Sequence, residues 1–333
     1  MVCRNRIAFL GAVLLWVVGG CASAPSHRPV DEKPWEDTAD RTPVESKDLI
    51  LPPYPTPAGQ VPTPHTERKV ALVLGGAGVA SFATVGLLKA LQQERVKIDL
   101  IVTTGWPTLF VLGKAFLSTI HELEWFATRL NEKDFFKVAL FDSEKGFASH
   151  ERLGTLIEST FHGKEIQDSR VPVVISAANI EYGEPEVFDR GQWKEPLLKA
   201  MSVPGLFRPY PAEADRQFIS SLHGLDVDEA RRRGAEIVVA VYMYDDYLRS
   251  LASGKKSADA LFRKLYRAQL RVNLGAQLRH ADIYGGIELF KSPTDFSAKR
   301  RALLAGYEEG LRIAKGLRSA RGRQYPSRQQ RGP

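Results

Sequence analysis

A short loop of small residues is the part of the sequence whose composition and spacing best suit chemistry. Gly75, Gly76, Ala77 and Gly78 follow the apolar run VALVL and precede a helix-forming run that begins at Ala80. A buried strand that leads through such a loop into a helix N-terminus directs backbone N–H groups toward one point, where an anion or a developing oxyanion is stabilised. The four loop residues are therefore candidate contacts of an oxyanion or a ligand.

The second apolar run, IDLIVTT, spans residues 98–104 and brings Gly105 and Trp106, which follow it, to the same loop. A hydrolase needs a nucleophile on the turn after such a strand, a base within hydrogen-bonding distance and donors for the oxyanion. The turn residue here is Gly105, and no serine occurs between Phe82 and Leu117. Gly105 can adopt the dihedral angles of a strained turn, but it carries no reactive group. Gly105 and Trp106 are retained as candidate ligand contacts.

The elements that must position this loop alternate between strands and helices. Short, nearly continuous apolar runs predict buried strands at residues 70–74, 100–104, 171–177, 184–188 and 237–242. Helical periodicity predicts helices at residues 82–91, 107–116, 119–130, 150–161, 226–233 and 298–317. This order is typical of an α/β fold in which helices cover both faces of a mostly parallel sheet.

Residues 255–280 combine basic and apolar side chains. Seven Lys or Arg residues in this stretch surround apolar residues such as Leu261, Leu265 and Val272. A basic amphipathic helix can lie on an anionic membrane. A surface helix that covers the sheet gives the same pattern, and we favour this second interpretation.

Residues 70–109 resemble the patatin-like phospholipase family, whose pattern is a strand, a GGGGxRG loop, a helix ending near LKAL, a second strand and a GxSxG turn. The corresponding segments here are GGAGVAS at residues 75–81 and GLLKAL at residues 86–91. Later segments resemble later parts of the family, so that the resemblance covers residues 69–310; these are 163–188, 198–209 (LKAMSVPGLFRP), 226–240 (DVDEARRRGAEIVVA) and 281–307. The resemblance implies a three-layer α/β/α patatin-like fold with a mostly parallel central sheet. It also implies lipid acyl hydrolysis by a Ser–Asp dyad.

Both members of that dyad are missing from the expected positions. The apolar residues around the turn align Gly105 with the family's nucleophilic serine. The family's DG[GA] motif, which supplies the aspartate, is expected in Phe218–Gly224, but this segment reads FISSLHG and contains no aspartate. Ala80 stands where the family has the arginine of the loop. The resemblance therefore predicts a retained architecture without catalytic residues.

Two functional hypotheses remain open. The first is a non-catalytic pseudo-hydrolase that binds a lipid or acyl ligand or serves as a scaffold for a protein partner in the envelope, and we favour it. The second is a divergent lipid acyl hydrolase whose nucleophile is Ser81, Ser220 or Ser221. A pair of Ser221 and His223 is conceivable, but neighbours two residues apart in a strand lack the geometry to exchange a proton. Whether the chain is an enzyme is therefore left open, and the loss of the dyad favours a non-catalytic protein.

Other kinds of chemistry find little support in the sequence. His121-Glu122-Leu123-Glu124 lacks the second histidine of a zinc-binding helix. The glycines at 75–78 are followed neither by the Lys-Ser/Thr of a phosphate-binding loop nor by a G-x-G-x-x-G spacing. We therefore expect no cofactor and no metal.

The first twenty residues have the pattern of a lipoprotein signal peptide. Arg4 and Arg6 precede an apolar run, Ile7–Val18, that is too short to span a bilayer. Val18-Gly19-Gly20-Cys21 resembles the bacterial lipobox, in which the cysteine becomes the lipidated N-terminus. An ordinary signal peptide with a cysteine nearby is the alternative. Lipidation of Cys21 would anchor the protein to a membrane, and Ala22 favours the outer membrane, facing the periplasm or the cell surface.

The remaining organisation follows from composition. Residues 21–67 contain ten of the twenty prolines and few large apolar residues, which predicts a disordered tether. The patatin-like domain is expected at residues 68–312, with a core at 70–244 and a helical C-terminal part at 255–312, before a basic disordered tail at 313–333. Without the signal peptide the chain has 44 Lys and Arg against 39 Asp and Glu. A net charge of +5 suits an anionic membrane surface better than a nucleic acid, which we do not expect as a partner.

Overall fold

The computed structural model describes residues 68–136, 148–211, 215–245, 258–289 and 292–322. The predicted signal peptide, Cys21 and the tether, at residues 1–67, lie outside the described residues, as do residues 323–333. No described helix is both long enough and apolar enough to cross a bilayer.

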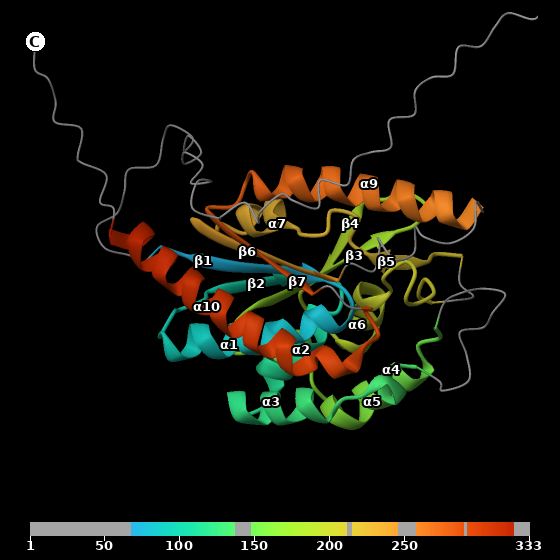
Figure 1. Cartoon of the computed structure of the whole chain (residues 1–333), viewed down its shortest axis with the longest axis horizontal. Helices are drawn as coiled ribbons and strands as arrows, with labels where there is room; N and C mark the ends of the chain where they lie inside the picture. The colour runs from blue at the N-terminus through green and yellow to red at the C-terminus, as the bar shows by residue number, and fades with distance from the viewer. Residues whose placement is uncertain (1–67, 137–147, 212–214, 246–257, 290–291, 323–333) are drawn as a thin grey trace, which may run out of the picture. The chain divides into compact units, whose positions relative to one another are not determined.

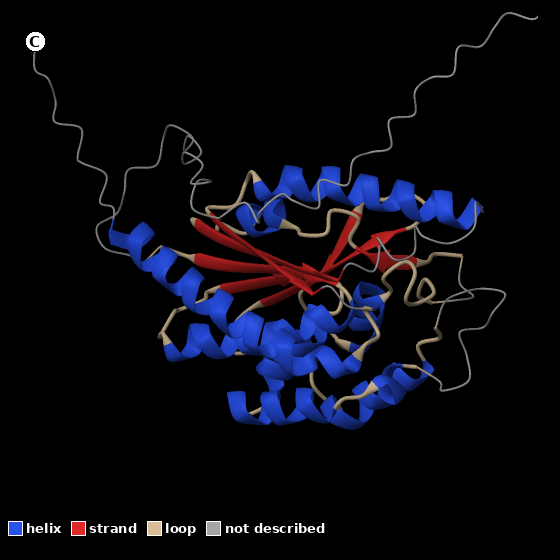
Figure 2. Cartoon of the chain, in the orientation of Figure 1, coloured by secondary structure: helices blue, strands red, loops and turns tan. Residues whose placement is uncertain are grey.

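The described strands form one mostly parallel sheet in the order β4-β3-β2-β1-β6-β7, with β5 also paired to β3 (Figures 1 and 2). They are β1 (Val70–Gly76), β2 (Leu100–Thr103), β3 (Val173–Asn179), β4 (Pro185–Phe188), β5 (Phe218–Ser220), β6 (Ile237–Asp245) and β7 (Ile283–Leu289). The pairs β1–β2, β1–β6, β2–β3 and β6–β7 are parallel, whereas β4 and β5 pair with β3 in the antiparallel sense. The expected mostly parallel sheet is confirmed.

The apolar runs of the central strands divide their side chains between two cores, as the period of a strand requires. Val70, Leu72 and Leu74 belong to the larger core on one face of the sheet. Ala71 and Val73 belong to the smaller core on the other face. All five side chains are fully buried, so both faces of β1 are covered.

Helices cover both faces and complete the expected three-layer α/β/α fold (Figure 1). The larger core is covered by α1 (Ala83–Gln93), α2 (Pro107–Phe116), α3 (Ile120–Arg129), α4 (Glu132–Phe135), α5 (Glu151–Phe161), α6 (Lys194–Met201) and α10 (Lys299–Gly322). The smaller core lies under α7 (Val227–Arg232) and α9 (Ala258–Leu278). Helix α9 therefore covers the sheet, as we expected of residues 255–280. Short 3-10 helices lie at Gly78–Phe82, Ile166–Asp168 and Phe296–Ala298.

The C-terminal part departs from the sequence-based expectation in two places. The region 255–312, predicted to be helical, contains the edge strand β7, whose sequence IYGGIEL is only half-buried and has no continuous apolar run. The tail predicted from residue 313 is wrong for residues 313–322, because α10 continues to Gly322. Its residues Ile313, Ala314 and Leu317 are buried and lie within the helix predicted at 298–317, which α10 exceeds by five residues at its C-terminal end.

Candidate functional site

The turn that follows β2 lies against the loop that follows β1. The two strands are parallel neighbours, so their carboxyl ends meet at the same edge of the sheet. Gly105 has a φ of +70°, which confirms that the turn needs a glycine-like conformation. The N–H of Trp106 donates a hydrogen bond of 3.1 Å to the carbonyl of Gly76, and the N–H of Gly105 donates one of 3.1 Å to Ala200. The turn is thus held by backbone groups on two sides.

There is no room for a side chain at Gly105. A Cβ atom placed on this residue would lie 2.0 Å from the carbonyl oxygen of Gly76, far inside van der Waals contact. The neighbouring atom belongs to the backbone of a buried strand and cannot turn aside as the end of a flexible side chain could. The position that aligns with a catalytic serine in the family therefore has neither a hydroxyl nor the space for a side chain.

Two N–H groups of the loop, those of Ala77 and Val79, are engaged within the protein. The N–H of Ala77 donates to the carbonyl of Met243 at 3.2 Å, and the N–H of Val79 donates to Pro293 at 2.8 Å. An oxyanion hole needs donors directed at free space, 2.7–3.1 Å from the oxyanion. These two donors are used by β6 and by the chain before α10, so the loop acts as a packed joint of the fold.

Residues 218–224, where the family's aspartate is expected, do lie next to the turn. Strand β5 pairs with residues 177–179 of β3, beyond the end of the β2 pairing. The buried Thr104 hydroxyl donates to the carbonyl of Ser176 at 2.8 Å and accepts from the N–H of Ser221 at 2.9 Å. Thr104 therefore connects β2, β3 and the loop after β5, a bridging role that the sequence did not indicate.

A serine–aspartate contact is present in this loop, although not where the family has it. The Ser221 hydroxyl donates to Oδ1 of Asp226 at 2.9 Å, and the His223 ring nitrogen Nδ1 lies 3.3 Å from the same oxygen. The hydrogen bond to Asp226 is the main reason why the pKa of His223 is raised. The sequence assigned Asp226 only to the following helix; the structure places it just before α7, with its carboxylate directed back to Ser221.

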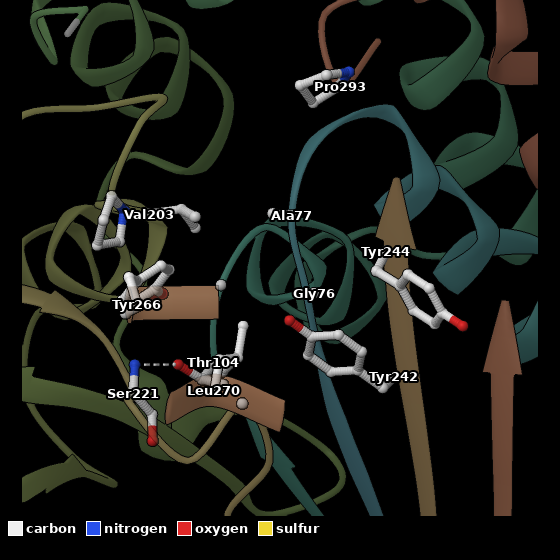
Figure 3. A pocket seen from close by; sticks show the side chains of 14 residues that line it. Gly76, Ala77, Thr104, Val203, Ser221, Tyr242, Tyr244, Tyr266, Leu270 and Pro293 are labelled. Atoms are coloured by element: carbon white, nitrogen blue, oxygen red, sulfur yellow. Dashed lines mark hydrogen bonds between the residues drawn. The ribbon is translucent and has the colours of Figure 1, made fainter. Parts of the chain in front are cut away.

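This contact does not make an accessible nucleophile. Ser221 is 2% exposed, and its hydroxyl lies on the opposite side of the residue from the hydrogen bond to Thr104 (Figure 3). The His223 ring contacts Asp226, and only the backbone N–H of His223 approaches the Ser221 hydroxyl, at 3.3 Å. The buried Oδ2 of Asp226 has no hydrogen-bond partner among the described residues. The cluster mainly shapes the loop between β5 and α7.

A small pocket lies beside the turn, with a volume of about 40 Å³ (Figure 3). The backbone of Gly76, Ala77 and Gly105 forms part of its wall, and the rest includes Thr104, Val203, Pro204, Ser220, Tyr242, Tyr244, Tyr266, Leu270 and Pro293. One water molecule needs about 10–15 Å³ by this measure, so the pocket holds a few waters. An acyl chain does not fit into it.

Tyrosines give this pocket a neutral, weakly polar character. The rings of Tyr242 and Tyr244 stack with centroids 5.6 Å apart. Burial raises the pKa of Tyr242, and burial raises the pKa of Tyr266 to about 12 against the opposing effect of its hydrogen bond to Ser220. Both phenols are therefore protonated at neutral pH. They can donate hydrogen bonds, but they cannot act as general bases there.

Only some of the residues proposed from the sequence reach the pocket. Gly76, Ala77 and Gly105 line it, whereas Gly75 and Gly78 do not. Trp106 lies in the larger core, fully buried and stacked on Phe135 with ring centroids 4.8 Å apart. Its ring supports the fold beneath the turn, and it is not a wall of the pocket.

Sequence reasoning also missed a buried histidine–serine pair. The Ser202 hydroxyl donates to the carbonyl of Leu198 at 2.7 Å, and it lies 2.8 Å from Nε2 of His150. Because the hydroxyl hydrogen is used by Leu198, Nε2 must carry the proton and donate to Ser202. Burial lowers the pKa of His150 to about 4, so the ring is neutral at pH 7. The two residues are 52 positions apart and no local motif connects them.

No group of three His, Cys, Asp or Glu side chains suited to a metal ion occurs among the described residues.

Known proteins similar to this chain are patatin-like phospholipases. Lysophospholipase nte1 of Aspergillus fumigatus is 26% identical over 179 residues, which cover 52% of this chain and 12% of that protein. Patatin-like phospholipase domain-containing protein 7 of Mus musculus is 26% identical over 196 residues, which cover 53% of this chain and 14% of that protein. The chain thus matches only a small part of the length of these relatives. Their similarity confirms the resemblance to the patatin-like family.

Two further comparisons gave no match or only a distant one. No protein-family model matches the chain. The crystal structure of VipD from Legionella pneumophila aligns with a TM-score of 0.47 and 9% identity, over 75% of this chain and 67% of that one. A likeness this distant carries no conclusion about the fold or the site.

Replacing Gly105 by alanine should destabilise the protein strongly. We expect a loss of about 3 kcal/mol in the free energy of unfolding, because the left-handed backbone costs about 1–2 kcal/mol and overpacking adds about 1–3 kcal/mol. Gly191→Ala is the matched control, since Gly191 has a φ of +81° but open surroundings. Urea unfolding followed by circular dichroism measures both variants. Equal losses in the two would show that Gly76 does not close the position.

The buried His150 should make stability depend on pH. A histidine whose pKa falls from 6.5 to about 4 on folding stabilises the folded state above pH 6.5, and this contribution is lost as the pH falls. The loss between pH 7 and pH 5 is about 2 kcal/mol. His150→Gln, which keeps a donor for Ser202, should show a smaller pH dependence in urea unfolding. The exposed His121, changed to Gln, is the control; a slope unchanged by His150→Gln would contradict the assignment.

Proposed function

We propose that this chain, a patatin-like protein by its sequence relatives, is a non-catalytic member that acts at the bacterial envelope by binding. The observation that carries the proposal is the closed nucleophile position. A Cβ atom at Gly105 would lie 2.0 Å from the carbonyl oxygen of Gly76, so this backbone does not accept even an engineered serine. Loss of the hydroxyl alone would be a simple substitution. A backbone that has closed over the position supports a role in which catalysis is no longer required.

The small pocket favours a surface role over that of a lipid carrier. A volume of about 40 Å³ between Tyr242, Tyr266 and Leu270 holds water but no acyl chain. The donors of the glycine-rich loop that face Met243 and Pro293 are already used. The binding function that we propose therefore rests on the outside of the domain, as a scaffold or as a contact with lipid headgroups.

The proposed place of action comes from the N-terminal sequence. The lipobox-like Val18-Gly19-Gly20-Cys21 supports lipidation of Cys21, and the proline-rich residues 21–67 would keep the domain some distance from that anchor. Two acyl chains hold a protein stably on a membrane, whereas one does not. We accordingly propose a lipoprotein of the outer membrane.

One observation favours the alternative of a divergent lipid acyl hydrolase. The hydrogen bond of 2.9 Å from the Ser221 hydroxyl to Asp226 has the composition of a Ser–Asp dyad, and Ser221 borders the pocket. Ser220 faces Tyr266, and Ser81 is fully buried, so both are weaker candidates. An opening of the loop between β5 and α7 would be needed to expose the Ser221 hydroxyl to a substrate.

A fluorophosphonate probe separates these two functions. We expect the native chain to remain unlabelled and to hydrolyse neither a lysophospholipid nor a p-nitrophenyl acyl ester above the background rate. Gly105→Ser should also stay inactive, because the introduced Cβ displaces the backbone that would have to hold it. Labelling or turnover that disappears in Ser221→Ala, while that variant keeps its circular dichroism spectrum, would establish the hydrolase instead.

Lipidation of Cys21 is tested in living bacteria. Radiolabelled or alkyne-tagged palmitate should be incorporated into the expressed protein, and sedimentation should place the labelled protein with the outer-membrane fraction. Cys21→Ser should abolish the label, whereas Cys3→Ser, which changes the other cysteine within the signal region, should leave it. Label that persists in Cys21→Ser would refute the proposed anchor.

A further inference from the structure

Helix α9 presents apolar side chains on both of its faces. Its inner face carries Leu270, which is 9% exposed, and packs Leu274 and Leu278 on the smaller core. Its outer face carries Leu261, Leu265 and Val272, which are 59%, 60% and 69% exposed. Spacings of four and seven residues align these three side chains along one stripe. Because the inner face already covers the sheet, the outer stripe is not part of the core of this domain.

Unbalanced positive charge accompanies this stripe. Residues 258–278 contain four Lys or Arg residues and one acidic residue, Asp259. Lys264, Arg271 and Arg279 are exposed, and none of them forms an ion pair within the described part of the chain. On α10, by comparison, Arg312 pairs with Glu309 and Arg318 pairs with Glu94, whereas Arg300 and Arg301 are exposed. Helix α9 therefore combines an outward apolar stripe with two exposed cations, Lys264 and Arg271, that form no ion pair with the residues the structure describes.

We propose that the outer face of α9, defined by Leu261, Leu265 and Val272 with Lys264 and Arg271, docks on the surface of an anionic lipid bilayer. The apolar side chains enter the boundary between headgroups and acyl chains, and the cations lie at the level of the lipid phosphates. A helix with this division of side chains lies in the plane of the interface, which the exposed length of α9 permits. The inference deepens the proposed surface binding by assigning it a face and a partner, and it holds whether or not the pocket retains any activity.

Charge decides between a bilayer and a second copy of this chain. In a symmetric pair of α9 helices, Lys264 and Arg271 of both copies would be brought close together across the contact, and like charges at short distance repel. An anionic lipid surface neutralises the same cations and is extended enough to accept the whole stripe. The bilayer is therefore the partner that fits both the apolar side chains and the charges.

Docking through α9 would place the pocket close to the lipid surface. Tyr266 and Leu270, which line the pocket, come from the same helix as the outward stripe. A helix with its side chains is about 10–12 Å in diameter, so the pocket and the docked surface are separated by little more than α9 itself. The bilayer would thus fix the orientation of the domain, which an N-terminal anchor alone does not.

The test is the binding of the full-length Cys21→Ser chain to vesicles of phosphatidylcholine with phosphatidylglycerol. Leu265→Glu/Val272→Glu should lower the vesicle partition coefficient at least about tenfold, since it removes buried apolar area and adds repelled charges. Leu304→Glu/Leu311→Glu on α10 is the matched control, because these leucines are 58% and 36% exposed. The control should change the coefficient less than about twofold in the same sedimentation assay.

Charge and depth supply independent measurements. Lys264→Gln/Arg271→Gln should weaken binding about tenfold or more, Arg300→Gln/Arg301→Gln should not, and added salt should weaken the binding of the parent chain. An environment-sensitive fluorophore on Val272→Cys, in a chain with Cys3 and Cys21 changed to Ser, should shift to the blue with these vesicles, whereas one on Leu304→Cys should not. Equal losses in the α9 and α10 variants, or equal binding to pure phosphatidylcholine vesicles, would overturn the proposal.

Discussion

The close approach of glycine backbones at the carboxyl edge of the sheet is the constraint on which the rest of the site depends. The carbonyl of Gly76 occupies the space where a side chain at Gly105 would stand and accepts a hydrogen bond from Trp106. Two neighbouring contacts are equally tight: a Cβ atom on Gly75 would lie 1.8 Å from the carbonyl of Gly224, and one on Gly76 would lie 2.0 Å from that of Met243. Three segments thus meet the β1 loop without any side chain between them. An edge that in a hydrolase holds a reactive turn has become a packed junction of backbone.

Elements with a clear local period were predictable. The strands around β1 follow from continuous apolar runs, and α2, predicted at 107–116, has the same ends in the structure. Strand β7 was missed because a half-buried edge strand with two adjacent glycines has neither a continuous apolar run nor a regular alternation. The predicted tail at 313–333 overlapped the helix predicted at 298–317, because the charge of this segment was weighed above the four-residue spacing of Ile313 and Leu317; α10 continues to Gly322. The sequence of α10 thus has a clear local period, whereas that of β7 has none.

Only those features of the site that depend on residue type alone were predictable from the sequence. The absence of a hydroxyl at position 105 and of an aspartate in 218–224 is visible in the sequence, and the φ of +70° at Gly105 follows from the kind of turn. What those residues touch is not visible. The Thr104 hydroxyl joins β3 to Ser221, which lies 117 positions after Thr104 in the sequence. His150 contacts Ser202, which lies 52 positions after it. Such contacts depend on how the sheet orders its strands, which a pattern of period two or 3.6 does not encode.

The junction also limits what the carboxyl edge of the sheet can bind. With a backbone carbonyl at the nucleophile position and the N–H groups of Ala77 and Val79 bonded to Met243 and Pro293, this edge of the sheet has no hydroxyl at position 105 and little space beside it. The protonated tyrosines and the cavity of about 40 Å³ agree with a junction whose residues serve packing. Helix α9 is not subject to this limit, because only its inner face packs on the smaller core and its outer face is free of that packing. An exposed Leu265 or Val272 contributes nothing to that core and adds apolar area exposed to water, which fits the proposed contact outside the domain.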